Sequence, residues 1–478
     1  MSRILWSSQE LAATLGEPTK APAASVVGVS IDTRTLQPGD LFFAIKGETG
    51  DGHAYVERAI AAGAPAAVVE RAQAEALAGS SALYVVEDTL RAMERLGVAA
   101  RRRSQARIAA VTGSVGKTSA KEMLRVALGQ AGPTHAATAS YNNHWGVPLS
   151  LARMPAAAEF GIFEIGMNHP REIEPLVAMV RPHAALVTTI APVHIEYLGS
   201  LQAIAEAKAE IFSGLERGGA AIIHRDAPQF DLLQRRARAA GARVTTFGAS
   251  EDADARLIHL EDRADGSLID ARIQGRDIKF RLGAPGRHMA ENALGVLLVV
   301  AALGVDIEAG AGALKDFSPG KGRGERVTLQ GADGTFTLID ESYNANPASM
   351  RAALDLLGVT APGRGGRRIA ALGDMLELGP EGAAMHVALA DTLRRARVDL
   401  LFCAGPLMRG LFEAAPPAMR GAWAARAADV EGSLLGALHG GDVVMVKGSN
   451  GSRMGPIVAA MKSNFAQGRH GAVKEPPC

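Results

Sequence analysis

The sequence predicts an α/β protein with three α/β domains, in which the central domain carries a P-loop mononucleotide-binding parallel sheet and the C-terminal domain is Rossmann-like. Three observations lead to this prediction. The 478 residues correspond to about three domains of ordinary size. Short apolar runs alternate with helical patterns, which is typical of parallel strands covered by helices on both faces. A glycine-containing loop lies between one apolar run and one helical pattern near the middle of the chain.

Composition excludes several classes of protein. The 51 Lys and Arg residues nearly balance the 50 Asp and Glu residues, so no global field attracts nucleic acid or an anionic membrane. The two cysteines, Cys403 and Cys478, form no disulfide framework and indicate a reducing compartment. Met1–Glu10 lacks the features of a signal peptide, and Ala293–Val305, the longest apolar stretch, is too short to span a bilayer. We therefore expect a cytoplasmic protein without nucleic-acid binding or membrane insertion.

Residues 1–106 form the first predicted domain. A helical pattern at Tyr55–Ala62 stands between short apolar runs, which indicates a small α/β unit. The domain ends in the basic helical stretch Leu90–Arg103, which we expect to be a linker helix on the surface, with Arg101, Arg102 and Arg103 as its solvated end. The apolar runs are Val26–Ile31, Leu41–Ile45, Ala66–Val69 and Leu83–Val86.

Residues 107–318 form the second predicted domain, a mostly parallel sheet. Strand-like alternation within Arg256–Leu282 predicts additional antiparallel hairpins, with turns at Asp265–Gly266 and Gln274–Arg276. The predicted strands are Ile108–Thr112, Gly161–Ile165, Ala184–Ile190 and Ala220–Ile223. The predicted helices are Lys117–Leu128, Arg171–Met179 and Phe230–Ala240.

Residues 319–478 form the third predicted domain, a second nucleotide-fold-like unit. The glycine-rich segment Ser318–Gly324 is a plausible hinge between it and the central domain. Its predicted strands are Thr335–Asp340, Arg368–Leu372, Leu400–Cys403 and Val443–Val446, each followed by a loop and a helical pattern.

The strongest chemical signal is the loop at Val111–Thr118, VTGSVGKT. It matches the Walker A pattern in part, because Val111 stands where a strict loop has its first glycine. Gly113 and Gly116 allow backbone N–H groups to surround phosphate oxygens at a helix N-terminus. Lys117 can reach the β- and γ-phosphates, and the Thr118 hydroxyl can ligate Mg²⁺. The alternative is a structural glycine turn. The expected nucleotide-binding residues are Thr112, Gly113, Ser114, Val115, Gly116, Lys117 and Thr118.

Three further residues are ambiguous without a wider context. Glu164 ends an apolar strand, where a carboxylate is costly unless it is paired in a salt bridge or functional. Strand ends of such sheets are where ligands bind, so a Mg²⁺ role is sensible. His194 follows another strand and would by itself be a structural or solvated histidine. Lys208 lies in a helical stretch, where a lysine usually faces solvent.

Together with several distant motifs, the loop resembles the Mur ligase family of peptidoglycan synthesis over essentially the whole chain. The order and combined extent of these motifs are specific, although each one is weak by itself. The motifs are Ser30–Arg34, Gly39–Gly47, Asp51–His53, Tyr141–Pro148, Ile339–Pro347, Ala371–Gly379 and Val446–Ser449.

The resemblance implies a metal centre and a modified lysine. It assigns Thr118, Glu164 and His194 to Mg²⁺, with two metal sites expected. It also implies that Lys208 reacts with CO₂ to form a carbamate, an anionic oxygen ligand in place of an ammonium that would repel the metal. Lys117, His194 and Lys208 are accordingly the expected catalytic residues.

The resemblance also implies substrate and nucleotide contacts in all three domains. His288 and Asn292 match a nucleotide-binding segment in which Met289 replaces an asparagine, and Glu341 replaces the commoner aspartate. The arginine expected to approach the ATP phosphates is Arg323, with Arg326 as the alternative register. Tyr343, Asn344 and Asn346 either contact nucleotide and substrate or cap the following helix. The expected substrate-binding residues are Ser30, Thr33, Arg34, Lys46, Gly47, Asn142, Asn143, Lys447 and Ser449.

The function implied is an ATP-dependent ligase that joins a peptide carboxylate of UDP-muramoyl-tripeptide to D-Ala-D-Ala through an acyl phosphate. Its partners would be these small molecules, and we expect a monomer. The first alternative is another ligase of the family, but the DNPR signature of the diaminopimelate-adding ligase is absent and the loop differs from the GTNGKGS of folylpolyglutamate synthase. The second is a P-loop regulatory or motor ATPase that performs no ligation.

Overall fold

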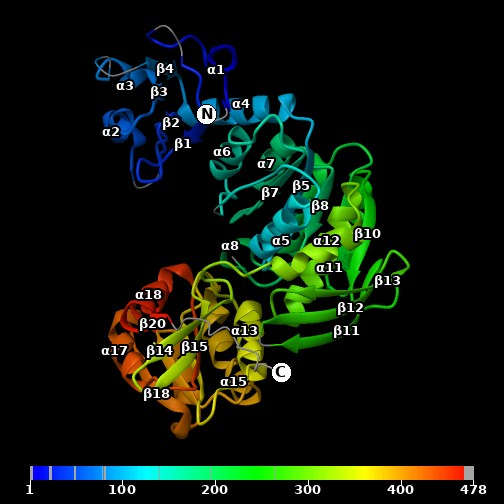
Figure 1. Ribbon diagram of the computed structural model, residues 1–478, viewed down its shortest axis with the longest axis vertical. Coiled ribbons are helices and arrows are strands. Elements are labelled where there is room, and N and C mark those ends of the chain that lie inside the picture. Colours follow the sequence, from blue (N-terminus) through cyan, green and yellow to red (C-terminus); the bar gives the residue numbers. More distant parts are fainter. Residues whose placement is uncertain are drawn as a thin grey trace, which may run out of the picture.

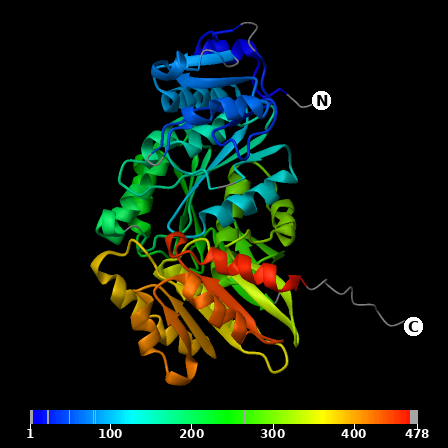
Figure 2. The same ribbon diagram turned by 90° about the vertical axis from the view of Figure 1, so that its left-hand side faces the viewer.

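The computed structural model describes residues 4–20, 24–47, 50–77, 79, 82–138, 140–193, 195–263 and 265–467. Within these residues the strands form three sheets, each with helices on both faces. The three sheets follow one another along the long axis of the molecule, with the N-terminal unit at one end and the C-terminal unit at the other (Figures 1 and 2). The predicted three-domain α/β architecture is confirmed.

The first domain contains a four-stranded parallel sheet with the order β1-β2-β3-β4. One apolar core on each face of this sheet explains why its strands are continuous hydrophobic runs. Its elements are α1 (Ser8–Leu15), β1 (Gly28–Ser30), β2 (Asp40–Phe43), η1 (Gly52–Tyr55), α2 (Val56–Ala61), β3 (Ala66–Glu70), α3 (Arg71–Ala74), β4 (Ala82–Val86) and α4 (Thr89–Arg103).

Helix α4 differs from the expected linker on the surface. Gly97 of α4 lies so close to α6 of the central domain that an added Cβ would be 3.0 Å from the Pro148 carbonyl oxygen. Arg102 is exposed as expected, but Arg101 is buried. Its guanidinium donates hydrogen bonds of 2.8 and 2.9 Å to the carbonyl oxygens of Val180 and Arg181. These carbonyls end helix α7 without intrahelical partners, so Arg101 caps a helix of the next domain and is not a solvated helix end.

Other contacts also join the first domain to the central one. The Trp6 indole N–H donates to the Ala152 carbonyl oxygen at 2.8 Å, and the Arg103 guanidinium stacks 3.5 Å from the Trp6 ring centre. Leu149 and Ala152 of α6 belong to one of the two cores of the first sheet. The first and central domains therefore share a core.

The central domain contains a nine-stranded sheet with the order β13-β12-β11-β10-β9-β8-β5-β7-β6, and apolar cores cover both faces. The seven strands β5 to β11 run parallel to one another, and the predicted antiparallel hairpins β11-β12-β13 continue the sheet. The Gln274–Gly275 turn has positive φ at both residues (50° and 82°), as a two-residue hairpin requires.

The elements of the central domain begin with the strand before the glycine loop. They are β5 (Arg107–Thr112), α5 (Lys117–Gly129), β6 (Thr134–Ala136), α6 (Gly146–Ala152), β7 (Phe160–Glu164), α7 (Ile173–Val180), β8 (Ala184–Val187), α8 (Ile195–Leu198), α9 (Leu201–Ala209), η2 (Glu210–Gly214), β9 (Ala220–His224), α10 (Phe230–Ala239), β10 (Arg243–Gly248), β11 (Ala255–Arg263), β12 (Gly266–Ile273), β13 (Arg276–Leu282), α11 (Arg287–Ala302), α12 (Ile307–Ala313) and η3 (Leu314–Asp316).

The third domain contains a seven-stranded sheet with the order β18-β17-β16-β19-β15-β14-β20, in which β14 pairs antiparallel with both β15 and β20 and the other pairs are parallel. Its elements are β14 (Glu325–Gly331), β15 (Gly334–Glu341), α13 (Pro347–Val359), β16 (Arg368–Gly373), η4 (Gly379–Glu381), α14 (Gly382–Val387), α15 (Ala390–Arg395), β17 (Leu400–Ala404), α16 (Met408–Ala414), η5 (Pro417–Met419), β18 (Arg420–Ala424), α17 (Ala427–Ala437), β19 (Val443–Lys447), η6 (Asn450–Ser452), α18 (Gly455–Asn464) and β20 (Ala466–Gln467).

Candidate active site

The glycine loop connects β5 to α5 at the carboxyl end of the central sheet. Gly113 and Gly116 have φ values of 149° and 87°. A Cβ at Gly113 would lie 1.9 Å from the Thr188 hydroxyl oxygen, and one at Gly116 would lie 2.5 Å from the Asn292 amide nitrogen. Both positions therefore require glycine for conformation and for space. Asn292 of α11 supports the loop from behind.

Lys117 and Thr118 begin helix α5 and extend from the loop in different directions. The Lys117 ammonium folds back and donates to the Gly113 carbonyl oxygen at 2.7 Å. Burial lowers the pKa of Lys117, the nearby Glu164 carboxylate raises it, and the charge of Arg323 lowers it further. The Thr118 hydroxyl donates to a carboxylate oxygen of Glu164 at 2.8 Å. The loop thus has the positive charge of Lys117 on one side, and the Thr118 hydroxyl and Glu164 carboxylate oxygens on the other.

Glu164 ends strand β7 and is buried, with only 4% of its surface exposed. Its second carboxylate oxygen accepts a hydrogen bond of 2.7 Å from the Asn142 side-chain amide. No lysine or arginine among the described residues forms an ion pair with it, which argues against the salt-bridge alternative. Two neutral donors hold a charged carboxylate at the carboxyl edge of the sheet, where it can accept a cation.

Lys208 is buried on helix α9, with 2% of its surface exposed, so it is not a solvent-facing helical lysine. Burial lowers its pKa well below the ordinary value, and the positive charge of Lys117 lowers it further. No hydrogen-bond partner of its amine is found among the described residues. The described part of the chain thus holds an amine of lowered pKa close to Lys117 of the phosphate loop. His194, which precedes α8, lies outside the described residues.

The third domain contributes Arg323 and Tyr343 to the same place. The Arg323 guanidinium stacks 3.9 Å from the Tyr343 ring centre and donates to the Ser140 hydroxyl at 3.1 Å. The guanidinium of Arg326, the alternative register, instead donates to the Thr360 hydroxyl within the third domain. Arg323 is therefore the arginine that faces the central domain.

The other polar residues of the third domain divide between the site and its support. The buried Lys447 ammonium lies 3.1 Å from a Glu341 carboxylate oxygen and donates to the Asn344 carbonyl oxygen. The Ser449 hydroxyl bridges the Leu376 amide and the Ala345 carbonyl. Asn346 caps helix α13, in agreement with the capping alternative for that residue.

These groups surround a cavity of about 350 Å³ between the central and third domains. Helix α11 contributes His288, whose pKa is lowered mainly by burial, and Met289 at the position of the expected asparagine. Four predicted site residues do not line this cavity: Thr112, Gly113, Asn292 and Ser449. The predicted residues on the wall are Ser114, Val115, Gly116, Lys117, Thr118, Asn142, Glu164, Lys208, His288, Arg323, Tyr343, Asn344, Asn346 and Lys447.

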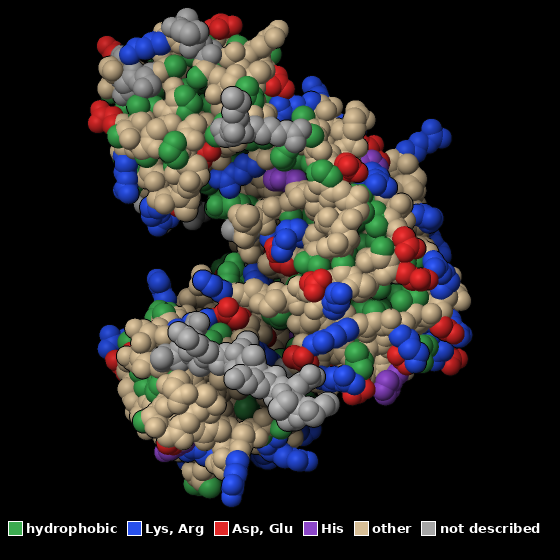
Figure 3. All heavy atoms as spheres, viewed as in Figure 1, with side chains coloured by type: hydrophobic (Ala, Val, Ile, Leu, Met, Phe, Trp, Pro, Cys, Tyr) green, Lys and Arg blue, Asp and Glu red, His purple; other side chains and the backbone are tan. Residues whose placement is uncertain are grey.

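A second cavity of about 1400 Å³ lies between the first and central domains. Ser30 lies beneath its wall, where its hydroxyl donates to the Asp32 carbonyl oxygen. The predicted residues on its wall are Thr33, Arg34, Lys46, Gly47, Asn142 and Asn143. The surface is deeply hollowed between the first and third domains (Figure 3).

The two cavities share one wall. Asn142, Gly166, Met167 and Asn168 line both of them. Of these four residues, only Asn142 was predicted from the sequence. The position of Gly166–Asn168 directly after the strand that ends in Glu164 is the signal that would have identified the others. A ligand in the larger cavity can therefore reach a group held by the phosphate loop.

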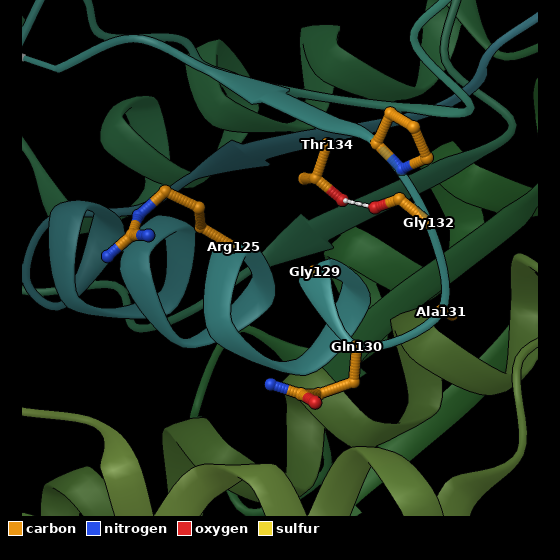
Figure 4. Close-up of a pocket in the computed structure, with 7 residues that line it drawn as sticks. Arg125, Gly129, Gln130, Ala131, Gly132 and Thr134 are labelled. Carbon is orange, nitrogen blue, oxygen red and sulfur yellow. Dashed lines mark hydrogen bonds between the residues drawn. The ribbon is translucent and has the colours of Figure 1, made fainter.

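A third concavity lies at the opposite end of α5 and is formed by Arg125, Gly129–Gly132 and neighbouring residues (Figure 4). It is open to solvent, and the Thr134 hydroxyl donates to the Gly132 carbonyl oxygen beside it. Arg125 forms an ion pair with Glu122. None of the predicted site residues lies there, so the chemistry belongs to the two joined cavities.

Models of three family regions match the chain: the "Mur ligase family, catalytic domain" at residues 25–110, the "Mur ligase middle domain" at 111–300 and the "Mur ligase, glutamate ligase domain" at 322–450. The UDP-N-acetylmuramoyl-tripeptide–D-alanyl-D-alanine ligase of Rickettsia prowazekii is 30% identical over 95% of this chain and 99% of that protein. The ligase of the same name from Escherichia coli is 34% identical over 91% and 94%.

Among solved structures, a crystal structure of MurF from Acinetobacter baumannii is similar with a TM-score of 0.82 and 27% identity, covering 96% of this chain and 99% of that one. The similarity extends over all three domains. The chain belongs to the Mur ligase family.

Proposed function

We propose that this protein is an ATP-dependent ligase that joins the terminal carboxylate of UDP-N-acetylmuramoyl-tripeptide to the amine of D-alanyl-D-alanine in peptidoglycan precursor synthesis. The shared wall of the two cavities is the observation that carries the proposal. A ligase of this kind must bring a carboxylate of one large substrate to the γ-phosphate of another. The names of the similar proteins support this choice of substrates.

The proposal assigns a role to each domain. Residues 1–106 bind the UDP-sugar, with the cationic Arg34 and Lys46 facing the larger cavity. Residues 107–318 bind ATP through the glycine loop. Residues 319–478 supply Arg323 and Lys447 to the ATP cavity from the opposite side. We also propose that the protein works as a monomer in the cytoplasm.

The groups around Glu164 suit a bound Mg²⁺. Mg²⁺ prefers carboxylate and hydroxyl oxygens and is held in phosphoryl-transfer sites by one or two protein ligands together with substrate phosphates. The Thr118 hydroxyl and the Glu164 carboxylate lie 2.8 Å apart on the cavity wall and provide such oxygens. We assign His194 to a second Mg²⁺ site. When bound, Mg²⁺ neutralises charge that develops on the transferred phosphoryl group.

Lys208 completes the second metal site as a carbamate in this proposal. An amine must be uncharged to attack CO₂, and burial next to Lys117 lowers the pKa of Lys208 in the required direction. The amine nitrogen forms a bond to the carbon of CO₂ and loses a proton, which leaves an anionic carbamate. The product places two oxygens where an ammonium would repel a metal ion.

The residues of the chain perform the remaining steps by positioning and by charge. Lys117 stabilises the γ-phosphoryl group as it passes to the peptide carboxylate and forms an acyl phosphate. Asn142, on the wall common to both cavities, is placed to orient that carboxylate. The amine of D-Ala-D-Ala then attacks the acyl carbon, and phosphate leaves. Arg323 and Tyr343 cover the ATP cavity and limit hydrolysis of the acyl phosphate by water.

Phosphate release tests the proposal. Purified protein with ATP and Mg²⁺ should release phosphate only when both UDP-muramoyl-tripeptide and D-Ala-D-Ala are present. Omission of either one should abolish the release, and mass spectrometry should show one pentapeptide product for each phosphate. Equal release without the two peptides would instead support a P-loop regulatory or motor ATPase.

None of the helices in the described part of the chain is long and apolar enough to cross a membrane.

A further inference from the structure

The charged side chains on the wall of the larger cavity differ in whether they have a partner. Four carboxylates line it, and each already has a partner. Asp32 pairs with Arg34, Asp51 with His53, Glu94 with Arg91, and Glu172 with His169. Among the described residues of the wall, Lys46, Arg58 and Arg171 are the cations that form no ion pair. The cavity wall therefore includes three cations without an ion pair, whereas two of its carboxylates pair with arginines and the other two are hydrogen-bonded to histidines.

Arg171 differs from the other two cations in its position. Lys46 and Arg58 belong to the first domain, whereas Arg171 follows the segment Gly166–Asn168 that separates the two cavities. The reacting carboxylate of the peptide must lie at that wall to meet the γ-phosphate. The side chain of that terminal residue extends roughly 6 Å over five bonds beyond Cα. Its distal group must therefore lie within about this distance of the wall. Arg171 is the unpaired cation nearest in sequence to this wall.

The backbone of Arg171 is held in an unusual conformation. Its φ of 67° lies in the left-handed region, which arginine rarely adopts. The carboxylate of Glu210 fixes it there by accepting hydrogen bonds from the amides of Arg171 (2.7 Å) and Ile173 (3.1 Å). Glu210 directly follows helix α9, which carries Lys208. A strained, exposed arginine beside a site is an indication of function, since glycine would fit the conformation at lower cost.

We propose that Arg171 binds a distal carboxylate on the third residue of the peptide substrate, and so selects a diamino dicarboxylic acid over lysine at that position. This inference rests on the proposed ligase function. Both side chains carry an ammonium five bonds from Cα, so the additional distal carboxylate of the dicarboxylic acid is the group that distinguishes them. A guanidinium binds a carboxylate through two parallel hydrogen bonds, whereas it repels an ammonium that has no carboxylate beside it. Glu172, the carboxylate beside it, is hydrogen-bonded to the Asn168 amide and to His169, whereas Arg171 forms no ion pair among the described residues.

The test compares two UDP-muramoyl-tripeptides, one ending in meso-diaminopimelate and one in L-lysine. Dissociation constants without ATP come from calorimetry, and kcat/KM comes from phosphate release. The parent protein should favour the diaminopimelate substrate by roughly 10- to 100-fold, the range expected for a hydrogen-bonded charge. Arg171→Gly and Arg171→Asn, which both tolerate positive φ, should reduce this preference to less than about threefold, because the diaminopimelate substrate loses a charged hydrogen bond and the lysine substrate no longer meets a repelling cation.

Arg397→Gly is the matched control. Arg397 is also an exposed arginine with positive φ (52°), and it lies outside both cavities. The control should keep the parent's preference. The melting temperature of Arg171→Gly should equal or exceed that of the parent, because glycine relieves the backbone strain.

Three results would overturn the inference: a parent protein that binds both peptides equally, one that prefers lysine, or an Arg171→Gly variant that weakens both peptides to the same extent. A parent that binds the diaminopimelate peptide selectively but ligates neither peptide would instead overturn the proposed function and leave the assignment of Arg171 standing.

Discussion

Replacement of Lys208 by methionine should separate stability from activity. The side chain is buried on the cavity wall, and burial lowers the pKa of its amine well below the usual value, so a lysine is costly at this position. Methionine has similar length and no polar end. The free energy of unfolding of Lys208→Met should therefore equal or exceed that of the parent, while ligation should fall at least 100-fold, about 2.7 kcal/mol of transition-state stabilisation.

The pH dependence of stability gives a second readout for the same variant. Because the pKa of Lys208 is lowered in the folded state, the unfolded chain binds the additional proton. The stability of the parent should therefore rise with pH between the lowered pKa and about 10.4, the ordinary value for lysine. Lys208→Met should lack this contribution. Urea unfolding of both proteins at several pH values measures the difference.

Lys121→Met is the control for Lys208. Lys121 is equally buried, but its ammonium donates to the Ala137 carbonyl oxygen at 2.5 Å and lies 3.0 Å from Glu122. Its loss should lower the free energy of unfolding by about 1–3 kcal/mol and leave ligation within about threefold of the parent. The reasoning is refuted if Lys208→Met retains more than about a tenth of the activity, or loses as much stability as Lys121→Met.

The carbamate itself can be tested in Lys208→Ala. Acetate or another small carboxylate should enter the vacated space and restore part of the ligation rate, whereas ammonium salts should not. The rate is measured against carboxylate concentration. Full activity of Lys208→Ala without any additive would exclude a carbamate role.

Three further predictions concern the glycine loop and a buried histidine. Lys117→Ala should abolish ATP turnover while calorimetry shows unchanged UDP-substrate binding; retention of more than about a tenth of kcat, a loss below ~1.4 kcal/mol, would contradict its phosphoryl role. Gly113→Ala should lower the free energy of unfolding by about 2–4 kcal/mol and impair ADP binding, because its Cβ would overlap the Thr188 hydroxyl. The control is Gly129→Ala, whose added Cβ would have nothing within 4 Å and which should be neutral or stabilising in the same urea titration. Burial lowers the pKa of His135 to about 4, so the stability present above pH 6.5 should decrease by at most about 3 kcal/mol as the pH falls to 4. A His135→Gln variant should show less pH dependence of stability, and an unchanged pH profile would contradict this prediction.

Strands, helices and the glycine loop could be predicted because their signals are local. The run Ile108–Thr112, the glycines and the helical pattern after Lys117 lie within about twenty consecutive residues, and the structure places them as β5, the loop and α5. The turn at Gln274–Gly275 was equally visible from Gly275, which adopts positive φ without steric cost. Short-range chemistry determines each of these features.

Features that depend on packing between distant segments could not be predicted. The burial of Arg101 depends on the end of α7, about eighty residues further along the chain. The burial of Lys208 depends on which face of α9 meets the central sheet, and a helical lysine alone gives no sign of it. The choice between Arg323 and Arg326 depends on the course of a glycine-rich segment. His194 lies outside the described residues, and its metal role stays a prediction.

Isotope transfer from the peptide carboxylate tests the central claim most directly. UDP-muramoyl-tripeptide with ¹⁸O in its terminal carboxylate is incubated with ATP, Mg²⁺ and D-Ala-D-Ala, and the released phosphate is analysed by mass spectrometry. If the carboxylate attacks the γ-phosphate and the amine then displaces phosphate, one ¹⁸O atom appears in each phosphate that accompanies a new peptide bond. Phosphate without ¹⁸O would show that ATP is hydrolysed by water and would contradict activation of the carboxylate at the wall shared by the two cavities.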